Sequence, residues 1–172
     1  MPLGRSLEVG IGLVADRRPL LLLDVDGVLN PFAADDCPEG YREHAFFPED
    51  ESPVRLCDAH GPWLNDLAQG FDLVWATGWE DEANTFITPV LSLPLLPVVR
   101  FPPAPFDAAE KVPAIDAFAD GRPAAWVDDA HAPEAWAWAD ARVAPTMLVA
   151  TDPSRGLTAK TVEELLCWRT SL

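Results

Sequence analysis

The sequence predicts an α/β fold, in which a doubly wound parallel sheet of about five strands carries helices on both faces. Short apolar runs alternate with helical patterns along the chain. Each run is apolar on both faces, as a strand covered on both sides must be. The 172 residues, 49% of them hydrophobic, are enough for one compact domain with a large core. Because ligands of such sheets bind beyond the carboxyl ends of the strands, functional residues are expected there.

The strands that we expect are the apolar runs at residues 20–25, 71–77, 95–101, 124–128 and 145–150. Each is far shorter than the roughly 20 apolar residues of a membrane span, so no membrane protein is expected. A parallel sheet requires a long crossover between successive strands, and the segments between these runs have the length and pattern of helices.

The expected helices follow in chain order. The helix at 62–68 begins with a proline, which suits a first helical turn. The helix at 80–87 has acidic residues in its first turn, where the helix dipole favours them. The helix at 112–119 has apolar residues at helical spacing and ends before an Asp-Gly pair. The last two cover the Ala- and Trp-rich residues 133–141 and the final segment 158–168.

The chain reads as a single domain over residues 19–172, preceded by a tail or edge segment at residues 1–18. One insertion interrupts the alternation of strands and helices, at about residues 31–61. It mixes aromatic residues, prolines and acids, and we expect a β-hairpin or flap over the end of the first strand. A loop of this length is uncommon without a function.

Charge limits the partners of the protein. Twelve basic residues face 28 acidic ones, for a net charge of −16. This charge repels phosphate backbones, so binding to nucleic acid is disfavoured, although a nucleic-acid end is not excluded as a substrate. Seven acids lie in residues 35–51, which we read as a solvated loop.

Cysteine usage and the N-terminal composition indicate the compartment. The three cysteines form no Cys-x-x-Cys pair and are odd in number, which favours free thiols in a reducing environment. The first residues lack the pattern of a signal peptide. A cytoplasmic protein is therefore expected, and both a monomer and a homodimer are compatible with the sequence.

The strongest chemical signal follows the first apolar run. Asp24 and Asp26 are one residue apart at the end of a strand, so their side chains can project toward the same side. Gly27 then allows a sharp turn of the backbone. Two nearby carboxylates repel each other unless a cation or a proton intervenes. The simpler interpretation, with Asp26 as a turn residue and Asp24 as an incidental strand end, does not explain why the pair lies at the ligand-binding edge.

Three weaker signals lie at the same predicted edge. Thr77 and Gly78 end the second run, where a hydroxyl and exposed amides suit a phosphate, although Thr-Gly is also a common transition to a loop. Lys111 is one of two lysines in the chain and precedes a helix, where a solvated charge is the ordinary interpretation. Asp128 and Asp129 end a further strand; a helix cap explains Asp129 but not Asp128.

In this order, Asp-x-Asp-Gly, Thr, Lys and Asp-Asp, the chain resembles the haloacid dehalogenase (HAD) superfamily from residue 20 to about residue 150. The segments Leu-Asp-Val-Asp-Gly-Val-Leu-Asn-Pro and Val-Trp-Ala-Thr-Gly-Trp-Glu are similar to the HAD-like domain of "Swiss Army knife" RNA-repair proteins. The resemblance implies a HAD-like Rossmannoid sheet with a small flap and no large cap, because the segment between Thr77 and Lys111 is too short for an extra domain.

The resemblance also implies the roles of the site residues. Asp24 would be the nucleophile that forms an aspartyl-phosphate, and Asp26 the general acid and base. Mg²⁺ is the implied cofactor, and its expected ligands are Asp24, the backbone carbonyl of Asp26, and Asp128, with Asp129 adjacent. The expected phosphate-binding groups are Thr77, Gly78, Lys111 and the amides after Asp26, beginning with Gly27. Trp79, His131 and Asn30 are candidates for the substrate rim.

The sequence thus predicts a Mg²⁺-dependent phosphohydrolase acting on a phosphomonoester: a small phosphate ester, a nucleotide or a nucleic-acid end. An acid at Asp26 favours phosphoryl transfer over dehalogenation, since halide leaves without a proton. One alternative is a non-catalytic HAD-fold domain that binds a phosphorylated ligand or protein partner. A phospho-accepting receiver domain is a further alternative, but the run at 95–101 does not end in the aspartate that receivers carry on their third strand.

Overall fold

The computed structural model describes residues 17–47, 49 and 52–172. The tail expected at residues 1–18 therefore lies outside the described residues, except for its last two. Among the described helices, none is both long enough and apolar enough to cross a bilayer.

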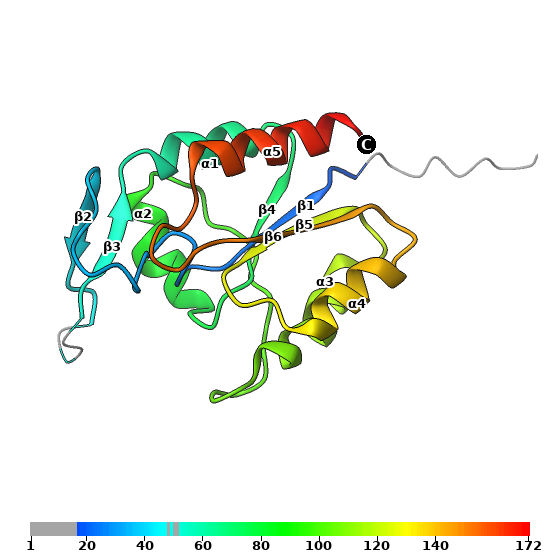
Figure 1. Ribbon diagram of the computed structural model, residues 1–172, viewed down its shortest axis with the longest axis horizontal. Helices are drawn as coiled ribbons and strands as arrows, with labels where there is room; N and C mark the ends of the chain where they lie inside the picture. The colour runs from blue at the N-terminus through cyan, green and yellow to red at the C-terminus, as the bar shows by residue number, and fades with distance from the viewer. Residues whose placement is uncertain (1–16, 48, 50–51) are drawn as a thin grey trace, which may run out of the picture.

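A sheet of four parallel strands forms the centre of the molecule (Figure 1). The strands are β1 (Leu20–Leu23), β4 (Asp72–Trp75), β5 (Ala124–Asp128) and β6 (Thr146–Ala150), in the spatial order β4-β1-β5-β6. β1 pairs in parallel with β4 on one side and with β5 on the other. The carboxyl ends of these three strands therefore meet at one edge of the sheet.

Helices cover both faces of this sheet, as the sequence predicts. On one face lie α1 (His60–Leu67) and α5 (Ala159–Thr170), and on the other lie α3 (Lys111–Ala119) and α4 (Pro133–Ala141) (Figure 1). The four residues of β1 are all leucine, and successive side chains are buried on opposite faces of the sheet. Leu21 and Leu23 pack in the core cluster that contains α1 and α5, whereas Leu20 and Leu22 pack in the cluster that contains α3 and α4.

The expected strand at 95–101 is reduced to a single β-bridge, so within the described residues the sheet has four strands instead of about five. Val98 forms this bridge with Trp75 at the outer side of β4. The Trp75 N–H donates to the Pro97 carbonyl (2.9 Å), and the Val99 N–H donates to the Trp75 carbonyl (2.8 Å). Because Pro94 and Pro97 have no N–H, this segment cannot extend the ladder.

The helix expected at 80–87 is a π-helical turn, η1 (Ala83–Ile87), that continues into α2 (Thr88–Val90). Pro89 gives a physical reason for the wider turn, since its ring would clash with the fourth preceding carbonyl of an α-helix and it has no N–H to donate. Farther along, a short 3₁₀ turn, η2 (Ala108–Glu110), leads directly into α3. In this part of the described chain no cap domain separates Thr77 from Lys111.

The insertion at about residues 31–61 contains the expected hairpin, formed by β2 (Tyr41–His44) and β3 (Val54–Cys57). The two strands are antiparallel, with Tyr41 opposite Cys57 and His44 opposite Val54. The hairpin lies near the end of the sheet where β1 finishes (left in Figure 1). The Tyr41 hydroxyl donates to the Arg155 carbonyl (3.2 Å), which fastens the hairpin to the loop after β6.

Near this hairpin, α1 contains a fully buried histidine, His60. Its Nε2 atom lies 3.2 Å from the Leu157 carbonyl oxygen. Burial lowers the pKa of His60 to about 4, from an ordinary value of 6.5. As the pH falls between these two values, the unfolded chain binds a proton at this position before the folded protein does. The contribution of neutral His60 to stability is therefore present above about pH 6.5 and is lost toward about pH 4.

We expect His60→Gln, which keeps a donor for Leu157, to flatten the acid side of the stability profile. Between about pH 7 and about pH 4, the free energy of unfolding of the wild type should fall by up to about 3 kcal/mol more than that of the variant. Urea unfolding at several pH values measures this difference. His44→Gln, at a partly buried position in β2, is the matched control. Identical pH profiles for the wild type and His60→Gln would contradict the expectation.

Candidate active site

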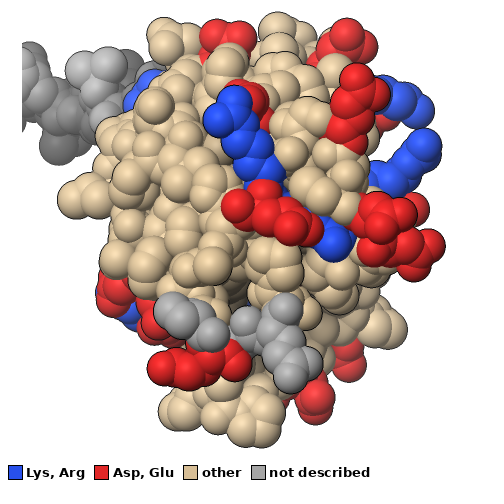
Figure 2. Space-filling view, turned by 90° about the vertical axis from the view of Figure 1, so that its left-hand side faces the viewer, with Lys and Arg blue, Asp and Glu red and all other residues tan. Residues whose placement is uncertain are grey.

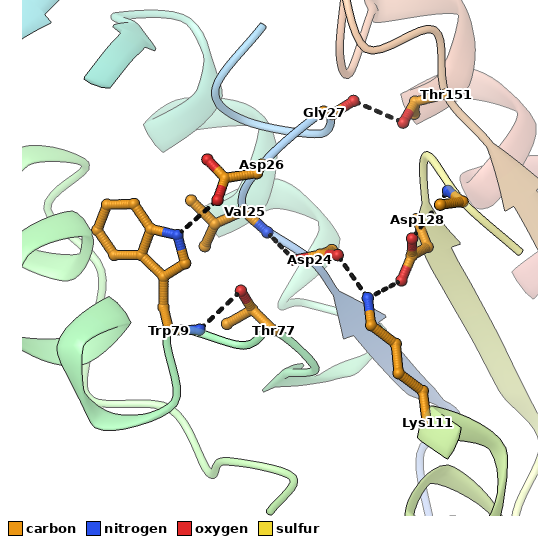
Figure 3. A network of polar contacts seen from close by, with 10 residues as sticks. Asp24, Val25, Asp26, Gly27, Thr77, Trp79, Lys111, Asp128 and Thr151 are labelled. Atoms are coloured by element: carbon orange, nitrogen blue, oxygen red, sulfur yellow. Dashed lines mark hydrogen bonds and ion pairs between the residues drawn. The ribbon is translucent and has the colours of Figure 1, made fainter. Parts of the chain in front are cut away.

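Three buried charged groups meet where β1 and β5 end (Figure 3). Asp24 follows β1, Asp128 is the last residue of β5, and Lys111 is the first residue of α3. The Lys111 Nζ atom donates to Oδ2 of Asp24 (2.8 Å) and to Oδ2 of Asp128 (2.7 Å). All three residues are less than a tenth exposed. The sheet thus brings together residues that are distant in the sequence.

The electrostatics of this group show an excess of negative charge. Burial raises the pKa of the Asp24 carboxyl above its ordinary value; Lys111 opposes this shift and the charge of Asp128 adds to it. Burial lowers the pKa of Lys111, but the charges of Asp24 and Asp128 outweigh burial, so its pKa is raised overall. The shifts differ in their main cause, which is burial for Asp24 and the two neighbouring carboxylates for Lys111, but in both cases two buried carboxylates share a single ammonium group. A further cation would relieve this repulsion.

The residues present fit a divalent metal ion. Asp24, Asp128 and Asp129 each offer a carboxylate oxygen, and these atoms lie within 4.8 Å of one another. Burial, followed by the charge of Asp128, raises the pKa of Asp129. A set made only of oxygen ligands matches the preference of Mg²⁺. Gly27 leaves room for this set, since a Cβ atom there would lie 2.3 Å from Cγ of Asp129.

Asp26 faces away from the buried lysine. Its Oδ2 atom accepts a hydrogen bond from the Trp79 indole Nε1 (2.8 Å), and its Oδ1 atom accepts one from Nδ2 of Asn30 (2.8 Å). Figure 3 shows Asp24 pointing toward Lys111 and Asp26 pointing toward Trp79. The two carboxylates of the Asp-x-Asp pair therefore have different partners, which is the condition for different chemical roles.

Two of the expected phosphate-binding groups, Thr77 and the Gly27 amide, make hydrogen bonds within the protein. Thr77 follows β4, is fully buried, and its hydroxyl accepts a hydrogen bond from the Trp79 N–H (3.3 Å). The Gly27 N–H donates to the Asn30 carbonyl (2.8 Å). This hydrogen bond lies within the turn after Asp26. Gly27 has a φ angle of +75° there, a conformation that favours glycine.

A cleft of about 820 Å³ opens beside Asp26 and is bordered by the hairpin. Its lining residues are Asp26, Asn30, Phe32, Phe47, Ser52, Pro53, Val54, Arg55, Gly78, Trp79 and Glu82. Two of the rim candidates, Trp79 and Asn30, thus line the cleft. The third, His131, is not part of its lining: its ring packs edge-on against Trp126, with the ring centroids 4.7 Å apart.

Sequence reasoning missed Thr151, whose hydroxyl donates to the Gly27 carbonyl (2.7 Å) and so braces the turn after Asp26 (Figure 3). Its position was a usable signal, since Thr151 directly follows β6 at the same edge of the sheet. Phe32 and Phe47 lie in the insertion that the sequence already marks as a flap over the end of β1, whereas Glu82, next to an irregular helical turn, had no such signal.

A doubly wound parallel sheet whose central strand ends in Asp-x-Asp-Gly, with a lysine held between the first of these acids and an Asp-Asp strand, defines a HAD-type domain. Comparison with protein-family models matches residues 20–162 to the HAD domain in Swiss Army Knife RNA repair proteins. The chain belongs to this family. A search of curated proteins and a search of solved structures each gave no match. Family membership supports a HAD-type phosphohydrolase in general, and HAD domains generally use Mg²⁺.

Proposed function

We propose that the protein hydrolyses phosphomonoesters through an aspartyl-phosphate on Asp24, with Mg²⁺ as its cofactor. The observation that carries this proposal is the buried Asp24–Lys111–Asp128 group, with Asp129 in reach, beside the separately held Asp26. In the first step Asp24 Oδ attacks phosphorus and the bond from phosphorus to the ester oxygen breaks, while Asp26 gives its proton to that oxygen. In the second step Asp26 takes a proton from water, which attacks phosphorus and releases phosphate and free Asp24.

The charges of the site support a metal requirement. Two carboxylates and a phosphate dianion bring four negative charges together, of which Lys111 offsets one. Mg²⁺, held by Asp24, Asp128 and the Asp26 carbonyl with Asp129 adjacent, would supply two positive charges to stabilise the phosphoryl group. Thr77 and Gly78 remain the proposed partners of the phosphoryl oxygens.

A small ester or a mononucleotide fits the surroundings better than a long polyanion. Arg55, the one basic residue among the described residues that line the cleft, is paired with Glu43, and two further arginines are also paired with acids: Arg42 with Asp58, and Arg100 with Glu80 and Asp81. On the face that Figure 2 shows, basic side chains are interspersed with acidic ones and form no continuous track. A net charge of −16 adds a long-range repulsion of nucleic acid.

A phosphatase screen with Mg²⁺ tests the proposed function. It covers nucleotides, sugar phosphates, phosphopeptides, and RNA and DNA oligomers with 3′- or 5′-phosphates. We expect small esters or mononucleotides to be hydrolysed at least as fast as oligonucleotide ends. A strong preference for oligonucleotides that weakens steeply with salt would contradict the charge argument and favour repair of nucleic-acid ends. Saturable binding without turnover in any class would favour the non-catalytic alternative.

The hairpin should influence which substrates are hydrolysed but not the affinity of the site for Mg²⁺. Because His44 and Val54 are the last residues paired between β2 and β3, residues 45–53 can be replaced by Asn-Gly, a two-residue turn suited to such a hairpin. This change removes Phe47, Ser52 and Pro53 from the cleft. We expect the ranking of substrates by kcat/KM to change by roughly tenfold or more, while Mg²⁺ affinity, measured by calorimetry, stays within about twofold. An unchanged ranking would exclude the hairpin from selection.

A further inference from the structure

We infer that Trp79 and Asn30 are positioning residues for Asp26, which they hold at the cleft where the leaving group departs. The inference rests on the acid–base role of Asp26 in the proposed function and extends it to two side chains whose hydrogen bonds do not involve Asp24, Lys111 or Asp128. Both oxygens of the Asp26 carboxylate accept a hydrogen bond of 2.8 Å, one from each residue. Both residues also line the cleft.

The direction of each hydrogen bond is fixed by its chemistry. An indole N–H can only donate, so Trp79 must face an acceptor. The side-chain amide of Asn30 has one oxygen and one NH₂ group. Its oxygen accepts the backbone N–H of Arg55 (3.0 Å), which leaves the NH₂ group to donate to Asp26. The orientation of Asn30 is therefore set by β3, and it could not be reversed without leaving two N–H groups face to face.

This arrangement explains how two carboxylates one residue apart act separately. Asp24 is held toward Lys111, whereas the donors of Trp79 and Asn30 hold Asp26 on the other side of the backbone (Figure 3). A freely rotating Asp26 would spend time away from the ester oxygen, or near the negative charge of Asp24. Fixing its rotamer in advance lowers the cost of reaching the geometry for proton transfer. The Arg55 contact makes this geometry depend on the hairpin as well.

Trp79→Phe tests the inference, because it keeps an aromatic ring and removes the N–H. Trp138→Phe is a matched control: the Trp138 Nε1 also donates to a carboxylate, Oδ1 of Asp116, at 2.8 Å, but this bond joins α4 to α3 and neither residue lines the cleft. We expect Trp79→Phe to lower kcat for alkyl phosphates roughly tenfold to a hundredfold, the scale of a hydrogen bond to a charged group, with KM changed by less than about threefold. Trp138→Phe should behave as the wild type.

Two further measurements separate positioning from a general loss of structure. In single turnover, Trp79→Phe should slow phosphorylation of Asp24 by aryl phosphates much less than by alkyl phosphates, because aryl leaving groups need little protonation. In an Asp26→Asn background, Trp79→Phe should cost less than about twofold more. Asn30→Ala, which removes the donor to Asp26 together with the acceptor for the Arg55 N–H and adds no charge, should show the same pattern. Its control is Asn65→Ala, at a partly buried position on α1.

The outcomes distinguish this inference from the function on which it rests. If the wild type lacks turnover that depends on Asp24, the proposed function fails and the inference fails with it. If turnover depends on Asp24 and Asp26 but Trp79→Phe matches Trp138→Phe, the inference alone is overturned. A readout without substrate gives a second check. The indole ¹H–¹⁵N resonance that disappears in Trp79→Phe should shift in Asp26→Asn; an unmoved resonance would also overturn the inference.

Discussion

Asp24→Asn should lower the turnover of phosphate monoesters by several orders of magnitude, the largest effect expected of any substitution in this protein. The amide keeps the size of the carboxyl group but loses the nucleophilic oxygen anion. It also removes one of the two negative charges that flank Lys111 and one oxygen of the candidate metal set. Steady-state assays on the best substrate of the screen measure this loss.

The matched control is Asp116→Asn, an exposed carboxylate on α3 that accepts a hydrogen bond from Trp138. It should leave turnover within about twofold of the wild type. Excess EDTA should abolish the activity of the wild type, and added Mg²⁺ should restore it, since Lys111 offsets only one of the four negative charges of Asp24, Asp128 and a bound phosphate dianion. Robust hydrolysis by Asp24→Asn, or by the wild type in EDTA, would place the chemistry elsewhere in the molecule.

Asp26→Asn should give the second-largest effect, a loss of about 10²- to 10⁴-fold in turnover of alkyl phosphates, which is the usual scale of acid–base catalysis. The physical reason is the leaving oxygen, which departs as an unstable alkoxide unless it receives a proton. An aryl oxygen leaves readily without one. In single turnover the formation of the phospho-enzyme should therefore slow much less for aryl than for alkyl phosphates.

Hydrolysis of the phospho-enzyme is also expected to slow in Asp26→Asn, because the attacking water loses its base. Rapid-quench experiments should then show the covalent intermediate accumulating with aryl substrates. Substrate affinity should change little, since the Asp26 side chain contacts Trp79 and Asn30 and lies apart from the proposed metal set. Equal losses for aryl and alkyl phosphates in the formation step would remove Asp26 from the acid role.

The sequence was sufficient to predict the layered fold because its signals are local. Four consecutive leucines in β1 indicate a strand that is buried on both faces of the sheet. The helical patterns between the apolar runs indicate that the strands are parallel and joined by helices. Once the strands are parallel, their carboxyl ends must share an edge. The meeting of Asp24, Asp128 and Thr77 at that edge follows from the strand assignment alone. The ordered motifs around them then identified the superfamily.

Other features depend on which donor meets which acceptor between distant segments, and only the tertiary structure decided them. The Gly27 amide is taken by the Asn30 carbonyl, and Asp26 is held by a tryptophan 53 positions away. The run at 95–101 has the composition of a strand, yet it contributes one bridge, because proline removes the N–H groups that a ladder needs. Periodicity records burial along one segment. The partner of each buried polar group is set by packing across the whole chain, which no single segment encodes.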